Sequence, residues 1–174
     1  MPPETQRTRD DLMTISVGDR LPEATLVRMG ANGPEEVTLS SLTQGRKVVI
    51  FALPGAYTGT CTTAHVPSFI RTKKDFDAKG VDAVICLAVN DPFVLDAWSK
   101  STGAGAAGIE MVGDVTSAFT KAVGMDFSNP ARGFVDRSKR YAVYVVDGVV
   151  KVLHAEENSG VCDISGGESM LAAI

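Results

Sequence analysis

Hydrophobic and polar positions alternate between two periodicities along the chain, which predicts strands and helices in turn. Apolar runs rich in β-branched residues predict strands over 47–53, 81–89, 109–113, 140–146 and 149–153. Segments of helical periodicity or composition predict helices over 61–79, 92–101, 115–123 and 167–174. Asp147 and Gly148, between the last two strands, are a strong signal for a two-residue hairpin.

Alternating strands and helices that end in an antiparallel hairpin predict an α/β protein with a mixed central sheet flanked by helices on both faces. The thioredoxin-like fold is one such arrangement. Residues 15–45 carry Gly30, Asn32, Gly33 and Pro34 between extended segments, which predicts an added N-terminal β-hairpin.

The length of the chain fits one domain. Its 174 residues, 44% of them hydrophobic, suffice for one well-filled core and are few for two. We expect a single domain over residues 13–174 after a flexible tail over residues 1–12. The charged N-terminus lacks the apolar centre of a secretory signal, and no run of about 18 apolar residues could cross a membrane. These features predict a cytoplasmic protein.

Charge and cysteine usage narrow the partners. A formal net charge of -4 leaves no basic surface for nucleic acid or for an anionic membrane, so small molecules and proteins are the expected partners. The three cysteines are an odd number without framework spacing. They are typical of free thiols in a reducing compartment rather than of structural disulfides.

The stretch PGAYTGTC joins a predicted strand to a predicted helix. Pro54 and Gly59 indicate a turn, and loops at strand ends often carry site residues. If the helix begins near Thr60, Cys61 lies in its first turn, where free backbone N–H groups and the helix dipole stabilise an anion. A thiolate placed there is a nucleophile, and the alternative is a buried structural cysteine.

Pro54-x-x-x-Thr58-x-x-Cys61 matches the P-x-x-x-T/S-x-x-C signature of the peroxiredoxins. The longer stretch PGAYTGTCTTAHVPSF resembles their type II, peroxiredoxin-5-like subfamily, although Gly59 stands where that subfamily often has proline. VNDPFVLDAW and KRYAVYVVDGVVKVL further along resemble the same subfamily. The resemblance implies a thioredoxin-like fold and a peroxidase that reduces hydrogen peroxide and alkyl hydroperoxides.

The resemblance also implies a role for each motif residue. Cys61 is the peroxidatic nucleophile, whose thiolate becomes a sulfenic acid. Thr58 offers its hydroxyl to the thiolate and the peroxide, and Pro54 covers the sulfur. Arg140 stabilises the thiolate and the developing oxyanion. An exposed charge at a strand end is the alternative for Arg140, and only the motif favours it over Arg137.

His65 lies one helical turn after Cys61 on the same face. A neutral imidazole does little for a thiolate, so we expect His65 to line the pocket. The spacing of Cys61 and His65 could also suggest a metal, but a zinc site needs about four ligands, and His154 is the only other histidine. We therefore expect no metal and no cofactor.

Regeneration of the thiol is open in the sequence. The resemblance makes Cys86 and Cys162 candidates for a resolving cysteine, with a packed core thiol as the alternative for Cys86. Proximity of two cysteines cannot be read from sequence. We expect an external thiol instead, glutathione with glutaredoxin or thioredoxin. The resemblance also implies a homodimer.

Other functions are weighed against the peroxidase. A non-enzymatic redox sensor or holdase could use Cys61 on the same fold, but would not need oxyanion-stabilising groups. A thioredoxin-like reductase lacks the second cysteine of C-x-x-C. Residues 103–108 match G-x-G-x-x-G with Asp126 downstream, but this stretch follows a predicted helix and precedes a strand, so we expect a loop rather than a dinucleotide site.

Overall fold

The structure is a computed structural model and describes residues 14–174. The expected tail over residues 1–12 lies outside the described residues, and the domain boundary at residue 13 stays a prediction. No helix in the described part of the chain is long and apolar enough to cross a membrane.

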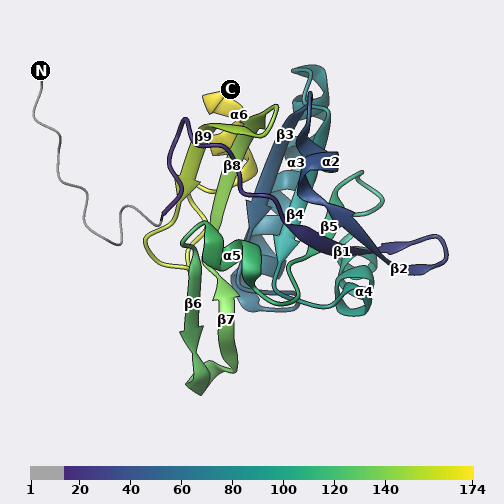
Figure 1. Cartoon of the computed structure of the whole chain (residues 1–174), viewed down its shortest axis with the longest axis vertical. Helices are drawn as coiled ribbons and strands as arrows, with labels where there is room; N and C mark the ends of the chain where they lie inside the picture. The colour runs from purple at the N-terminus through teal and green to yellow at the C-terminus, as the bar shows by residue number, and fades with distance from the viewer. Residues whose placement is uncertain (1–13) are drawn as a thin grey trace, which may run out of the picture.

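A seven-stranded mixed sheet forms the centre of the molecule, in the order β2-β1-β5-β4-β3-β8-β9 (Figure 1). The strands β3, β4 and β5 are parallel, and their other neighbours pair antiparallel. The seven strands are β1 (Thr25–Gly30), β2 (Gly33–Thr38), β3 (Lys47–Ala52), β4 (Ala83–Ala88), β5 (Glu110–Gly113), β8 (Tyr141–Val146) and β9 (Val149–Ala155). This confirms the predicted α/β class and the mixed sheet.

The helices and a separate two-stranded ribbon complete the fold (Figure 1). The helices are α2 (Leu39–Thr43), the π-helix η1 (Cys61–His65), α3 (Val66–Ala78), α4 (Pro92–Thr102), α5 (Ala118–Ala122), the 3-10 helix η2 (Pro130–Arg132) and α6 (Gly167–Ala173). The ribbon consists of β6 (Asp126–Asn129) and β7 (Phe134–Ser138). In Figure 1 the ribbon projects from the main sheet at the lower edge of the view.

Both faces of the sheet are buried, and β3 shows why the sequence reads as an unbroken apolar run. Val48 and Ile50 join the core on one face, with side chains of α2 and α5. Val49 and Phe51 join the core on the other face, with side chains of α3, α4 and α6. Burial on two faces removes the polar alternation that a one-sided strand would have.

Two turn predictions are confirmed. Asp147 and Gly148 both have positive φ, 48° and 76°, as the tight turn between β8 and β9 requires. The N-terminal hairpin is β1–β2, and its pairing runs from Thr25 opposite Thr38 to Gly30 opposite Gly33. Residues 103–108 form the loop from α4 to β5, so the glycine motif does not follow a strand.

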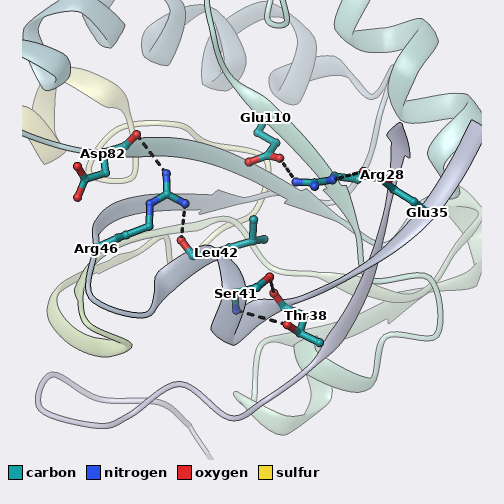
Figure 2. Close-up of polar contacts among 8 residues, drawn as sticks. All are labelled: Arg28, Glu35, Thr38, Ser41, Leu42, Arg46, Asp82 and Glu110. Carbon is teal, nitrogen blue, oxygen red and sulfur yellow. Dashed lines mark hydrogen bonds and ion pairs between the residues drawn. The ribbon is translucent and has the colours of Figure 1, made fainter. Parts of the chain in front are cut away.

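Polar contacts attach the hairpin and α2 to the sheet (Figure 2). Arg28 of β1 binds Glu35 at 2.8 Å and also pairs with Glu110 of β5. Arg46 donates to the carbonyls of Leu42 at 2.9 Å and Asp82 at 3.4 Å. These contacts lie away from the site described below.

The structure differs from the predicted elements in two helices. The helix predicted over 115–123 is only α5, because Asp114 accepts the N–H groups of Phe119 and Thr120 and so caps a later start, and Ser117 is left-handed. The helix predicted over 61–79 opens with the π-helical segment η1. The structure also has α2 and the β6–β7 ribbon, which the sequence patterns did not predict.

Candidate active site

The turn that follows β3 is held by its own polar groups. The Thr58 hydroxyl donates to the Gly55 carbonyl at 2.7 Å, and the Thr58 N–H donates to the same oxygen at 3.4 Å. The Ala56 N–H donates to Oδ1 of Asn90 at 2.9 Å, which ties the turn to the end of β4. The turn therefore has a fixed shape, and the backbone strain at Tyr57, with φ of 63°, is tolerated within it.

Cys61 lies in the first turn of a helix, as predicted. The helix begins at Gly59, and the Thr62 N–H donates to the Thr58 carbonyl at 3.1 Å. The Val66 N–H reaches back to the Cys61 carbonyl, five residues earlier, which makes this segment π-helical. Short π-helical segments inside α-helices are frequent at functional sites. The Cys61 side chain is fully buried, with an exposed fraction of 0%.

Sheet pairing brings Arg140 to Cys61. Arg140 directly precedes β8, and Tyr141 at the start of β8 pairs with Ala52 at the end of β3. The residue before β8 therefore lies beside the turn after β3. Nη2 of Arg140 donates to Sγ of Cys61 at 3.1 Å, and the side chain is only 1% exposed. The alternative of an exposed charge at a strand end is excluded.

The other two nitrogens of the Arg140 guanidinium are also bonded. Nε donates to the Ser159 carbonyl at 3.0 Å, and Nη1 lies 2.9 Å from Nδ1 of His65. A buried cation is costly unless its donors are satisfied and a negative group lies nearby. Here the three contacts fix the direction of the guanidinium, and the Cys61 sulfur is the atom on which a compensating negative charge can form.

His65 is placed deeper than the sequence suggested. We expected it to line the pocket; its ring is fully buried and contacts Arg140, and it is not among the residues that line the cavity described below. Burial and the positive charge of Arg140 lower the pKa of His65 to about 3, so the ring is neutral. Its Nε2 lies 2.9 Å from the Ser165 carbonyl, an acceptor only, so Nε2 carries the proton and Nδ1 accepts from Arg140.

A cavity of about 620 Å³ opens beside this cluster. Pro54, Thr58 and Arg140 line it on the side of Cys61, which itself is not among the lining residues. The β6–β7 ribbon and the loop after β9 form its other walls, through Phe127, Asn129, Arg132, Phe134, Glu157, Asn158, Ser159 and Gly160. The three motif residues around Cys61 are thus the floor of a pocket that a small substrate can enter.

Comparison with known proteins agrees with this geometry. The Redoxin family model matches residues 16–171. The chloroplastic peroxiredoxin-2E-2 of Oryza sativa subsp. japonica is 47% identical over 165 residues, which cover 92% of this chain and 73% of that protein. The mitochondrial peroxiredoxin-2F of Arabidopsis thaliana is 41% identical over 165 residues, which cover 94% of this chain and 82% of that protein.

A solved structure is also similar over most of the chain. The crystal structure of reduced Prx3 in complex with H2O2 from Vibrio vulnificus superimposes with a TM-score of 0.86 at 38% sequence identity, over 92% of this chain and 99% of that one. This chain belongs to the peroxiredoxins. It is a member of their type II subfamily with a thioredoxin-like fold, and it is a thiol peroxidase.

The other two cysteines of this peroxiredoxin are placed very differently. In the described residues 14–174 all three cysteines are free. Cys86 lies inside β4 and is fully buried; burial, with a smaller contribution from Cys61, raises the pKa of its thiol well above the usual value. Cys162 is half-buried in the loop before α6, and burial raises the pKa of its thiol.

Three further residues reach the peroxiredoxin site, and no role was predicted for any of them from the sequence. Ser159 and Ser165 contribute backbone carbonyls, which any residue could supply, from the loop between β9 and α6. Arg137 donates from Nη1 to the Pro54 carbonyl at 3.0 Å. Arg137 and Arg140 were the two candidate arginines in the sequence; Arg140 contacts the sulfur, and Arg137 contacts the turn.

Proposed function

We propose that Cys61 is the peroxidatic cysteine and that the enzyme reduces hydrogen peroxide and alkyl hydroperoxides. The observation that carries the proposal is the 3.1 Å contact from Nη2 of Arg140 to Sγ of Cys61 in the first turn of a helix. The guanidinium lies where negative charge passes through the sulfur in the proposed reaction. The Prx3 of Vibrio vulnificus, with H2O2 in its crystal structure, supports the substrate class.

In the first step the Cys61 thiolate attacks one oxygen of the peroxide and an S–O bond forms. The O–O bond breaks, so sulfur is oxidised and the peroxide is reduced. The product on the enzyme is a sulfenic acid, and the departing hydroxide or alkoxide takes up a proton to leave as water or alcohol. Arg140 stabilises the negative charge that moves from sulfur to the leaving oxygen.

Pro54 and Thr58 complete the reaction site. Pro54 is buried at the floor of the cavity, where its ring limits the access of water to the sulfur. Thr58 lines the cavity, and its hydroxyl proton is donated to the Gly55 carbonyl, so the hydroxyl oxygen is left to act as an acceptor for a peroxide proton. An incoming peroxide is then held by Thr58 as acceptor and by Arg140 as donor.

The walls of the cavity support organic hydroperoxides as substrates. The cavity volume of about 620 Å³ is far more than hydrogen peroxide needs. Phe127 and Phe134 meet edge to face at 5.9 Å between ring centroids and supply an apolar surface in the cavity. An alkyl chain packed on these rings would leave its hydroperoxide group toward Thr58 and Arg140.

An external thiol, glutathione with glutaredoxin or thioredoxin, is our proposed reductant. The first thiol displaces water from the sulfenic acid and forms a mixed disulfide with Cys61. A second thiol then attacks this disulfide, releases Cys61 as a thiol and is itself oxidised. The burial of Cys86 in the centre of the sheet and the raised pKa of the half-buried Cys162 both favour an external over an internal thiol.

We propose a homodimer that forms at the carboxyl ends of the parallel strands, next to the site. Tyr57, Phe93 and Val115 are exposed large apolar residues, and they follow the neighbouring parallel strands β3, β4 and β5. The carboxyl ends of parallel strands lie at the same end of a sheet. These three residues therefore lie at that end, where a second copy could cover them. Sedimentation of the wild type and of Phe93→Asp tests this, with a shift to monomer expected.

The cytoplasm is our proposed location. Free thiols at all three cysteines of the described chain fit a reducing compartment. The relatives named chloroplastic and mitochondrial make organelles the competing outcome. Fractionation of cells that produce the full-length chain decides between them.

Stopped-flow oxidation by hydrogen peroxide tests the activity. Trp98 is the single tryptophan, and its Nε1 donates to the Thr62 hydroxyl at 3.1 Å, so its fluorescence reports on the residue next to Cys61. We expect the reduced protein to react orders of magnitude faster than a free thiolate, and Cys61→Ser to show no signal. A rate like that of an ordinary cysteine would overturn the proposal and favour the redox sensor.

A further inference from the structure

The β6–β7 ribbon touches the catalytic turn through one polar contact. Arg137 of β7 is half-buried and donates from Nη1 to the Pro54 carbonyl at 3.0 Å. Its guanidinium also lies 5.7 Å above the centre of the Phe134 ring, a cation-π contact. The same side chain therefore binds the turn that carries Pro54 and the aromatic wall of the cavity.

The turn is shaped to receive this arginine. Gly55 follows Pro54, and a Cβ atom built on Gly55 would overlap Nη1 of Arg137. The φ angle of Gly55, 156°, is also one that side-chain-bearing residues rarely adopt. A glycine at this position allows the guanidinium to pass close to the backbone. The contact therefore depends on two residues: Arg137 supplies the donor, and Gly55 leaves the space for it.

We propose that Arg137 is a positioning residue for the peroxidase reaction, which holds the Pro54 wall of the cavity at the correct distance from the Phe134 wall. The inference rests on the proposed function of Cys61. Arg140 stabilises negative charge at the sulfur. Arg137 instead keeps the shape of the cavity in which the peroxide aligns with the sulfur.

Loss of Arg137 should disturb the alignment of the peroxide with the Cys61 sulfur. Pro54 is buried. Without its charged donor, its carbonyl lowers its free energy if it moves toward water or toward another donor. Such a movement displaces the proline that covers the sulfur. A misplacement of about 1 Å can cost about 10²-fold in rate, because the attack needs the reacting atoms in line.

Arg137→Met tests the inference, with Arg20→Met as the matched control. Arg20 also donates from Nη1 to a backbone carbonyl at 3.0 Å, that of Asp147, beyond the opposite end of β8. For each variant three quantities are measured: the rate constant with hydrogen peroxide, the rate of Cys61 alkylation by iodoacetamide across pH, and the midpoint of thermal unfolding. Arg137→Lys, which keeps a charged donor, is measured in parallel.

We expect Arg137→Met to lower the peroxide rate constant by about tenfold or more. The alkylation rate and its pH profile should stay as in the wild type, because Arg140 still contacts the sulfur. Arg137→Lys should recover part of the lost rate, and Arg20→Met should react with peroxide as the wild type does. If Arg137→Met does not fold, Arg137→Leu replaces it as the uncharged variant without a donor.

Two results would overturn the inference. One is a native peroxide rate in the uncharged variant. The other is a change in alkylation. Peroxide and alkylation rates that fall equally, or a shifted pH profile of alkylation, would mean that Arg137 acts on the thiolate or only on the stability of the fold. A wild-type protein that reacts as slowly as a free thiol would instead refute the peroxidase proposal itself, so the two failures are distinguishable.

Discussion

Nδ1 of His65 accepts a hydrogen bond of 2.9 Å from Nη1 of Arg140, and the opposite ring nitrogen donates to the Ser165 carbonyl. The histidine is therefore neutral and aims the arginine at the Cys61 sulfur. Burial disfavours a charged ring, and a protonated ring would also lie against the cation of Arg140, so the pKa of His65 falls to about 3. The direction of Arg140 depends on this neutral form.

We predict that His65 makes the native state less stable in mild acid. The unfolded chain takes up a proton on this residue near pH 6.5, whereas the folded chain does so only near pH 3. The unfolded state thus binds more protons between these values. Stability from His65 is fully present above about pH 6.5 and falls by roughly 1.4 kcal/mol per pH unit below it. Urea unfolding between pH 5 and 8 measures the slope.

His65→Gln is the test variant, because the amide can accept from Arg140 and donate to Ser165 without titrating. We expect the slope between pH 5 and 6.5 to become shallower in this variant. His154→Gln, at the only other histidine, serves as the control. A slope equal to that of the wild type in His65→Gln would contradict the neutral buried histidine.

Arg140→Lys separates the charge of the guanidinium from its shape. Lysine keeps the positive charge but cannot bond Cys61, His65 and the Ser159 carbonyl in three fixed directions. We expect the rate constant with hydrogen peroxide to fall by about 10²-fold. Stopped-flow fluorescence measures it, with Arg46→Lys, away from the site, as the control (Figure 2). An unchanged rate in Arg140→Lys would show that charge alone suffices.

The elements around the site were predictable because their signals are local. Apolar runs, the Asp147-Gly148 turn and the strand-turn-helix context of Cys61 need no knowledge of distant residues. The two-strand ribbon β6–β7 was missed for the opposite reason. Its burial is partial, and its strands are short and polar, so periodicity over residues 126–138 carries little information.

Contacts to the reactive sulfur were predictable only in part. Pro54, Thr58 and Cys61 stand in one motif, and Arg140 could be placed only by a resemblance. The role of His65 depends on where Arg140 lies, 75 residues further along, so no local pattern reveals it. Backbone carbonyls such as that of Ser159 leave no trace in the residue type. Side chains that act through long-range pairing therefore required the structure.

Turnover should not need Cys86 or Cys162. We expect Cys86→Ala and Cys162→Ser each to keep steady-state peroxidase activity with glutathione and glutaredoxin, or with thioredoxin. The reason is that Cys86 is fully buried in β4 and that burial raises the pKa of both thiols. Consumption of hydrogen peroxide by the purified variants measures this, with Cys61→Ser as the inactive reference. Loss of turnover in either variant would identify a resolving cysteine and refute the external thiol.

Ser117→Gly should stabilise the fold. Ser117 has φ of 63° before α5, and its buried hydroxyl has no hydrogen-bond partner among the residues that the structure describes. Glycine removes the left-handed strain and the buried hydroxyl, at the cost of a more flexible unfolded chain. We expect a net gain of about 1 kcal/mol in the free energy of unfolding by urea. Ser117→Ala removes the hydroxyl but keeps the strain, so its gain should be smaller. If alanine stabilised the fold as much as glycine, the buried hydroxyl rather than the left-handed backbone would be what destabilises this turn.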